Sequence, residues 1–159
     1  MSPGRVLAGE YPGSVDLDDA RSKLRWLLET GVSAIFDLTE AGELEPYSTV
    51  LTEEANRLGV APEHQRWPIR DVSSPTVEAM TEMLDAIDEA VEAGKVVYLH
   101  CMAGLGRTGV VVGCYLVRHG RSGEEALVEI ARLRRDLPYG SMDSPYTDGQ
   151  RNMVREWTE

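Results

Sequence analysis

Residues 100–109, with the sequence HCMAGLGRTG, constrain the fold more than any other stretch of this chain. The mostly apolar residues 95–99 before them predict a buried strand, and the apolar residues 110–117 after them predict a buried helix. A strand, a tight glycine turn and a helix start gather backbone N–H groups around one point, at the positive end of the helix dipole. The segment therefore predicts an anion-binding loop between a strand and a helix.

Two side chains of this loop are suited to catalysis. A positive local field favours the thiolate form of Cys101, which is the nucleophilic form. Arg107 returns to the same point and can hold a phosphate through two parallel hydrogen bonds. A thiolate nucleophile beside a phosphate clamp indicates phosphoryl transfer. The residues between them are expected to bind the substrate phosphate, and they are Met102, Ala103, Gly104, Leu105 and Gly106.

The same residues also allow other interpretations. Residues 104–109 also match the dinucleotide fingerprint G-x-G-x-x-G, but that loop normally opens the first βα unit of a domain and gives Cys101 no role. Cys101 could instead be an inert buried thiol, which is the interpretation that we favour for Cys114 in the apolar stretch after the loop. For His100 we expect structural support of the loop through ring hydrogen bonds.

Strands alternate with helices along the chain. This order predicts a single α/β domain over residues 1–159, with a central, mainly parallel sheet flanked by helices. The Cys101 loop then lies at the carboxyl end of a strand, where such sheets bind ligands. Predicted strands cover residues 32–38 and about 64–67, and predicted helices cover about 16–30, 47–58 and 75–93. Ser74–Pro75 is expected to open the third of these helices. Two further helices are expected to begin at a capping box at 122–125 and at Ser144–Pro145.

The charge and composition of the chain limit the classes of molecule that it can bind. The net charge of -11 argues against nucleic acid and against an anionic membrane, so a phosphorylated substrate needs a local binding pocket. We find no run of about 18 apolar residues and no apolar amino-terminal signal. Cys101 must stay reduced to react, which favours the cytoplasm. No metal-ligand spacing is present. We therefore expect a cytoplasmic monomer without metal or cofactor.

The loop resembles the active-site signature of the cysteine-dependent protein tyrosine phosphatase superfamily, H-C-x5-R-[ST]. His100, Cys101, Arg107 and Thr108 occupy its fixed positions. The chain length and the residues 8–12 (AGEYP) resemble the small dual-specificity type. This resemblance implies that Cys101 attacks phosphorus, Arg107 holds the phosphate oxygens and Thr108 assists the later departure of the cysteine.

The resemblance also implies a general acid on a loop about thirty residues before the cysteine. Asp71, in the segment 67–75 (WPIRDVSSP), lies at that distance. Asp37, at a strand end, is the main competitor, and Asp143 is a more remote one. Related enzymes use a later glutamine to position the hydrolytic water, and Gln150 is the candidate. Helical spacing predicts that Gln150 shares a face with three large apolar residues, namely Tyr146, Met153 and Trp157.

The resemblance implies hydrolysis of phosphotyrosine in proteins. The chain lacks the Lys-Asn-Arg-Tyr segment that deepens the pocket of larger relatives, so we expect phosphoserine and phosphothreonine to be accepted as well. Two alternatives stay open: the same chemistry on a phosphoinositide, inositol phosphate, nucleotide or RNA end, or a phosphate-binding module without turnover. Arg66 and Arg70 either add positive potential near the pocket or are solvated. We interpret the pairs Glu43/Glu45 and Glu53/Glu54 as solvated charges.

Overall fold

A four-stranded parallel sheet forms the centre of the computed structural model, which describes residues 5–159. The strand order is β1-β4-β2-β3, and every neighbouring pair is parallel. The strands are β1 (Arg5–Gly9), β2 (Val32–Asp37), β3 (Glu63–Arg66) and β4 (Val96–His100). The predicted α/β fold with a parallel sheet is confirmed.

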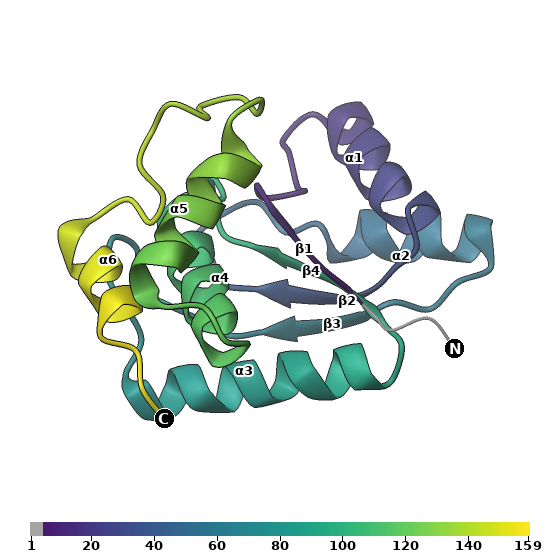
Figure 1. The fold of residues 1–159 in the computed structure, drawn as a ribbon. Coiled ribbons are helices and arrows are strands. Elements are labelled where there is room, and N and C mark those ends of the chain that lie inside the picture. Colours follow the sequence, from purple (N-terminus) through teal and green to yellow (C-terminus); the bar gives the residue numbers. More distant parts are fainter. Residues whose placement is uncertain (1–4) are drawn as a thin grey trace.

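Within residues 5–159, six helices cover the two faces of this sheet (Figure 1). They are α1 (Leu17–Glu29), α2 (Ser48–Leu58), α3 (Val77–Glu92), α4 (Arg107–Arg118), α5 (Gly123–Arg134) and α6 (Asp148–Arg155). Helices α1 and α2 lie on one face, and the other four lie on the opposite face. Among the described residues, no helix combines the length and apolar character needed to cross a membrane.

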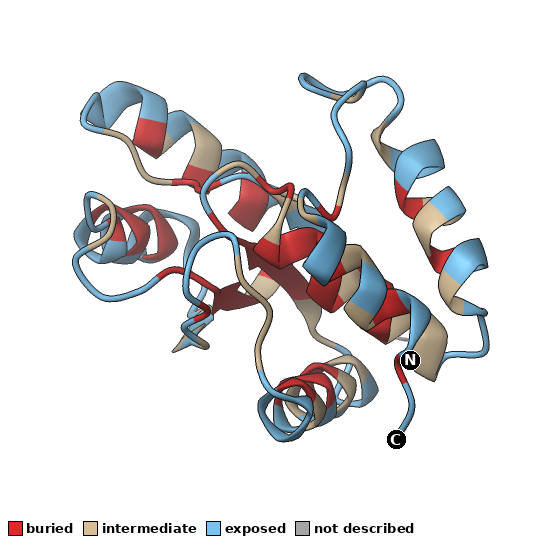
Figure 2. Ribbon diagram, turned by 90° about the vertical axis from the view of Figure 1, so that its left-hand side faces the viewer, coloured by how far each residue is buried: buried red, intermediate tan, exposed pale blue. Residues whose placement is uncertain are grey.

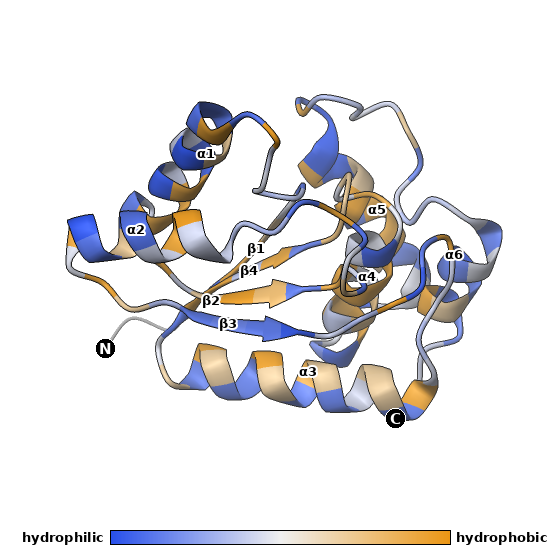
Figure 3. Cartoon of the chain, turned by 180° about the vertical axis from the view of Figure 1, so that it is seen from behind, coloured by the Kyte–Doolittle hydropathy of each residue, from blue (hydrophilic) through white to orange (hydrophobic). Residues whose placement is uncertain are grey.

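Side chains along the inner strands β2 and β4 point alternately to the two faces of the sheet, so the apolar core has two parts. In β2, Ala34 and Phe36 join the core under α3 and α4, whereas Ile35 joins the core under α1 and α2. This is the two-residue period of a strand buried on both faces. Figure 2 shows buried positions on the inner strands and on the helix sides that face them. Strand β3 is hydrophilic in Figure 3, as suits the edge of a sheet.

Helix starts differ from prediction in two places. The Thr76 hydroxyl caps α3 by accepting the Ala79 N–H, so the predicted opening by Ser74–Pro75 is wrong. Helix α6 begins at Asp148 behind a capping box of Thr147 and Gln150, so its predicted opening by Ser144–Pro145 is also wrong. The predicted capping box of Ser122 and Glu125 is confirmed.

Candidate active site

The loop between β4 and α4 lies at the carboxyl edge of the sheet. Parallel register places His100, the last residue of β4, beside Gly9 of β1 and Asp37 of β2. Residues 101–106 then turn into α4, which begins at Arg107. Gly104 has a φ of 69°, and a Cβ there would lie 2.7 Å from the backbone of Gly9. Glycine is therefore required at this point, and it lets the loop pack directly on β1.

Two contacts from later elements hold the loop. The Arg134 guanidinium donates to the Gly104 carbonyl oxygen over 2.8 Å, and the Ser144 hydroxyl donates to the Leu105 carbonyl oxygen over 2.7 Å. The second contact explains the wrong prediction at Ser144, because its hydroxyl is committed to the loop instead of a helix start.

The loop borders a pocket of about 420 Å³. Most of the predicted site residues line it, namely Asp71, Cys101, Met102, Ala103, Leu105, Gly106, Arg107 and Gln150. Gly104 packs on β1 instead. Thr108 does not line this pocket; it is buried, and its hydroxyl has no hydrogen-bond partner within the described chain. The assistance that we predict from Thr108 therefore has no preformed contact with Cys101 and stays a prediction.

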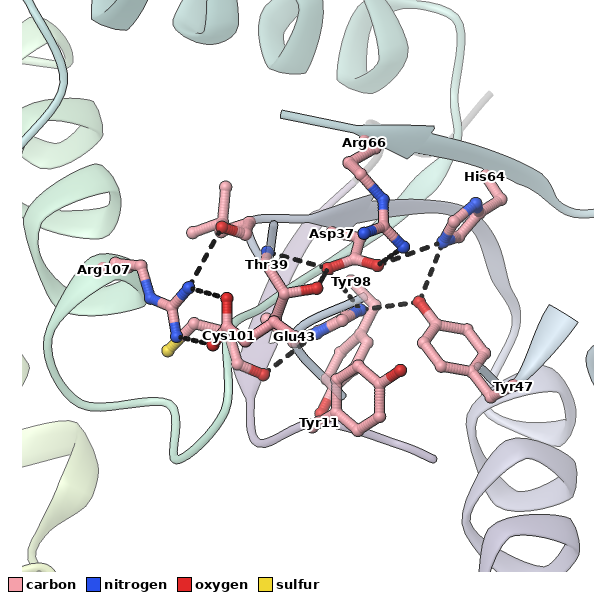
Figure 4. A network of polar contacts seen from close by, with 12 residues as sticks. Tyr11, Asp37, Thr39, Glu43, Tyr47, His64, Arg66, Tyr98, Cys101 and Arg107 are labelled. Atoms are coloured by element: carbon pink, nitrogen blue, oxygen red, sulfur yellow. Dashed lines mark hydrogen bonds and ion pairs between the residues drawn. The ribbon is translucent and has the colours of Figure 1, made fainter. Parts of the chain in front are cut away.

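The Arg107 guanidinium is buried and held by Glu43 (Figure 4). Two hydrogen bonds of 2.8 and 2.6 Å join Nη1 and Nη2 to the Glu43 carboxylate, and Nη1 also donates to the Ile69 carbonyl oxygen over 3.1 Å. These bonds from Arg107 lower the pKa of Glu43. The solvated interpretation of Glu43 was wrong, because its carboxylate fixes the plane of the phosphate clamp.

One edge of the guanidinium remains open toward the pocket. Glu43 occupies one N–H of Nη1 and one of Nη2, and within the described chain Nε donates no hydrogen bond, which leaves Nε and the second N–H of Nη2 for a ligand. The Asp71 Oδ1 atom lies 3.5 Å from Arg107 Nη2. A planar fork bound on one edge can still present two parallel donors to a phosphate on the other.

Asp71 is the carboxylate that lies in the pocket. Its side chain is 63% exposed and accepts a 2.9 Å hydrogen bond from the Val72 N–H. Asp37 is buried, and although burial raises its pKa, the His64 ring 3.6 Å away and two hydrogen bonds from Thr39 outweigh this effect and lower the pKa to about 2. Asp143 does not line the pocket and lies 3.7 Å from Arg151. The geometry therefore favours Asp71 over both competitors as the acid.

His100 supports the loop through a chain of hydrogen bonds that continues to Tyr47 and His64, both labelled in Figure 4. Its Nδ1 donates to the Cys101 carbonyl oxygen over 3.2 Å, and its Nε2 lies 2.7 Å from the Tyr47 hydroxyl. Burial lowers the pKa of His100 to about 4, so the ring is neutral and Nε2 must accept. Tyr47 therefore donates to His100 and accepts from His64 Nε2 over 3.0 Å. Neither Tyr47 nor His64 is predicted from the sequence as part of this support.

Gln150 is buried between the segment 67–75, which carries Asp71, and the nucleophile loop, the segment 100–109 that carries Cys101. Its Nε2 donates to the Ser73 carbonyl oxygen over 2.9 Å, and its Oε1 accepts the Thr147 N–H over 3.1 Å. The predicted shared helix face is wrong for Tyr146, which precedes α6 and is exposed, and for Trp157, which follows its end. Since both amide atoms have partners, Gln150 must exchange one before it can hold a water, and that role stays a prediction.

The remaining predicted charges lie elsewhere. Arg66 pairs with Asp37 at 3.2 Å and so supports the buried carboxylate instead of the pocket, and Arg70 does not line the pocket. The solvated interpretation of Glu54 was wrong. Its buried carboxylate joins α2 to α1 through ion pairs with Arg21 and Arg25 and also pairs with Arg57 of α2 itself, and hydrogen bonds from Arg25 and Arg21 lower its pKa.

The fold and this site define a cysteine-based phosphatase of the dual-specificity and tyrosine phosphatase superfamily. A family model described as "Polymorphic toxin system, DSP-PTPase phosphatase" matches residues 11–121, and the chain belongs to this family. Membership in this family favours the phosphatase interpretation of the loop over the dinucleotide fingerprint.

Relatives with known names support the same class. The mouse "Protein tyrosine phosphatase domain-containing protein 1" (Mus musculus) is 32% identical over 97% of this chain and 20% of its own length. An Arabidopsis thaliana "Phosphatidylglycerophosphate phosphatase PTPMT1" is 32% identical over 80% of this chain and 34% of its own. The chain thus spans only about a fifth to a third of these relatives. The structure of Tk-PTP in its active form covers 96% of this chain and 90% of its own, with 30% identity and a TM-score of 0.74.

Proposed function

We propose that this domain is a metal-independent phosphatase that hydrolyses phosphotyrosine in proteins, and phosphoserine and phosphothreonine as well, through a cysteinyl-phosphate intermediate. The observation that carries the proposal is a pocket with one cation at its base and an apolar mouth. The names of the relatives include both a protein tyrosine phosphatase domain and a lipid phosphatase, so the names do not favour one substrate class. The residues that line the pocket support a protein substrate.

Charge in the pocket favours a substrate with a single phosphate. Arg107 is the one cation among the described residues that line it, and Glu43 and Asp71 already oppose its charge. A substrate with several phosphates would leave its additional charges without partners, beside a domain of net charge -11. This observation supports a phosphomonoester over an inositol polyphosphate.

The mouth of the pocket favours an organic group with a large apolar surface. Five exposed apolar side chains surround it, and they are Val72, Met102, Tyr139, Met142 and Tyr146. Apolar and aromatic walls gain free energy by covering an aromatic ring. Phosphotyrosine presents such a ring next to its phosphate.

The first chemical step forms the cysteinyl phosphate. The Cys101 thiolate attacks phosphorus, the bond from phosphorus to the ester oxygen breaks, and the Asp71 carboxyl group protonates the departing oxygen. The Nε/Nη2 edge of Arg107 and the N–H groups of the loop hold the three equatorial oxygens, where charge develops in the transition state.

The second step regenerates the enzyme. Water attacks phosphorus, the Asp71 carboxylate takes its proton, and the bond from sulfur to phosphorus breaks to release inorganic phosphate and the thiolate. In this proposal Gln150 orients the water and the Thr108 hydroxyl turns toward the departing sulfur. Both cysteines are free. We propose that the domain works as a monomer in the cytoplasm, where Cys101 stays reduced, with phosphorylated proteins as its partners.

Release of phosphate in the presence of a chelator tests this proposal. Matched phosphotyrosine, phosphoserine and phosphothreonine peptides are compared with inositol phosphates, nucleotides and dispersed phosphatidylglycerophosphate, with Cys101→Ser as the inactive control. We expect Cys101-dependent release, fastest from phosphotyrosine. Release only from a lipid, inositol or nucleotide phosphate would contradict the protein substrate, and no release from any compound would favour a binding module.

A further inference from the structure

A second groove, of about 580 Å³, opens beside the Cys101 pocket. Ala103 and Tyr139 line both cavities, so the two adjoin at the rim of the nucleophile loop. The walls come from the end of β1, from α1 and from the connection between α5 and α6. Figure 1 shows α1 and that connection on either side of the end of β1. A substrate bound at Cys101 therefore has this groove as its immediate neighbour.

The walls of the groove are largely apolar. They include Trp26 of α1, which is 62% exposed, together with Leu137 and Tyr139, which are also exposed. Trp26 is not among the residues with which α1 packs on the sheet, so the fold does not account for it. Clustered exposed apolar side chains commonly mark a binding surface.

Charges at the border of the groove are mostly satisfied within the chain. Lys23 lies 3.3 Å from the Glu10 carboxylate and 3.1 Å from the Asp19 carboxylate. Arg134 donates to the Gly104 carbonyl oxygen of the nucleophile loop, but within the described chain its buried Nε has no hydrogen-bond partner and it forms no ion pair. The preference for an apolar occupant therefore rests on the exposed apolar walls and not on these charges.

The backbone at the junction of the cavities is unusual. Tyr139 has a φ of 60°, and Val72 has a φ of 53°; they are the two non-glycine residues with positive φ in the described chain. Both line the Cys101 pocket, and Tyr139 also lines the groove. Backbone in this sparsely populated region is concentrated at functional sites, where the surrounding structure holds it. Its position here indicates that the rim between the cavities is shaped for a ligand.

We propose that this groove is a substrate subsite that binds an apolar side chain two residues away from the phosphorylated residue. The inference rests on the proposed function. In an extended peptide, side chains two residues apart point to the same face and are separated by about 7 Å, whereas immediate neighbours point away. A peptide whose phosphoresidue enters the Cys101 pocket thus directs its next same-face side chain into the adjoining groove. Trp26 and Leu137 then select that side chain, and the net charge of -11 disfavours a lipid chain delivered from an anionic surface.

Matched phosphotyrosine peptides test the subsite. Each carries one leucine or one glutamine, placed one or two residues before or after the phosphotyrosine, and kcat/KM is measured for each. Burying most of a leucine side chain corresponds to about a tenfold preference. We expect this tenfold preference for leucine over glutamine at the position two residues away on one side of the phosphotyrosine. Trp26→Ala is expected to abolish the preference without changing kcat/KM for p-nitrophenyl phosphate.

A second exposed residue of α1 supplies the control. Leu17 is 60% exposed and lines neither cavity, so Leu17→Ala is expected to keep the preference. Two results would overturn the subsite while leaving the proposed phosphatase activity intact. One is the same kcat/KM for the leucine and glutamine peptides at every position, and the other is a leucine preference that survives Trp26→Ala. A dependence on Trp26 seen with dispersed phosphatidylglycerophosphate but not with peptides would also overturn it. Failure to hydrolyse any peptide would instead refute the proposed function, and the subsite with it.

Discussion

Replacing Glu43 by glutamine tests whether the carboxylate positions the phosphate clamp. Glu43 is 20% exposed and Arg107 only 1%, so water replaces little of the lost interaction. Glutamine keeps one acceptor but turns an NH₂ group toward a guanidinium donor, which costs one of the two charge-assisted hydrogen bonds. Such a bond contributes about 1.5–3 kcal/mol. If this energy holds the guanidinium in its transition-state position, kcat/KM falls by about 10- to 150-fold.

The assay is steady-state hydrolysis of p-nitrophenyl phosphate with Glu45→Gln in parallel. Glu45 is exposed and belongs to the same connection, so this variant makes the same change of charge without touching Arg107. We expect Glu45→Gln to stay within about twofold of wild type, since exposed charges contribute little. Equal losses in the two variants, or full activity in Glu43→Gln, would refute a positioning role for Glu43.

Further predictions concern the acid, the support below the loop, pH and salt. Asp71→Asn is expected to lower kcat by about 10²–10⁴-fold, measured by phosphate release; a negligible loss would remove Asp71 as the acid. Tyr47→Phe leaves the His100 Nε2 acceptor unpaired and is expected to cost about 1–3 kcal/mol, measured by urea unfolding, and an unchanged midpoint would contradict the hydrogen-bond chain. The folded pKa of His100, about 4, lies below its ordinary 6.5, so the unfolded chain binds more protons between these values and stability falls by up to about 3 kcal/mol as pH drops from 6.5 to 4. Asp37, with a pKa of about 2, extends the loss below pH 3.8, and unfolding midpoints across this range check both. Raising salt from low ionic strength screens the repulsion between an anionic substrate and the acidic surface, so kcat/KM is expected to rise; a fall would indicate attraction.

The sheet and most helices could be predicted because their signals are local. Strand β2 is mostly apolar and almost fully buried, and the glycine loop of residues 100–109 separates a strand from a helix. Strand β1 was missed because it begins at Arg5 and ends at Gly9, with three apolar residues between them and no periodicity. It becomes a strand through parallel pairing with β4, which is a long-range interaction.

The same distinction separates the site residues that were found from those that were missed. Cys101 and Arg107 belong to one loop, so their spacing along the chain reports their spacing in space. Glu43 lies 64 residues from Arg107, and Tyr47 lies 53 from His100. One signal could have found them: both follow β2, whose carboxyl end shares an edge of the sheet with the Cys101 loop.

The missed residues change the mode of phosphate binding that we propose for the domain. The loop alone suggests that a cation attracts the substrate, but the structure places two carboxylates against Arg107 in a domain of net charge -11. Attraction at a distance is therefore weak, and binding depends on donors already aimed at the phosphate, since Glu43 holds the guanidinium plane and His100 holds the loop. Such preorganisation favours the transition state, whose equatorial oxygens match the fixed donors, more than any free phosphate ion. The acidic surface and the buried carboxylates thus fit an enzyme that selects its substrate through short contacts at the rim of its pocket.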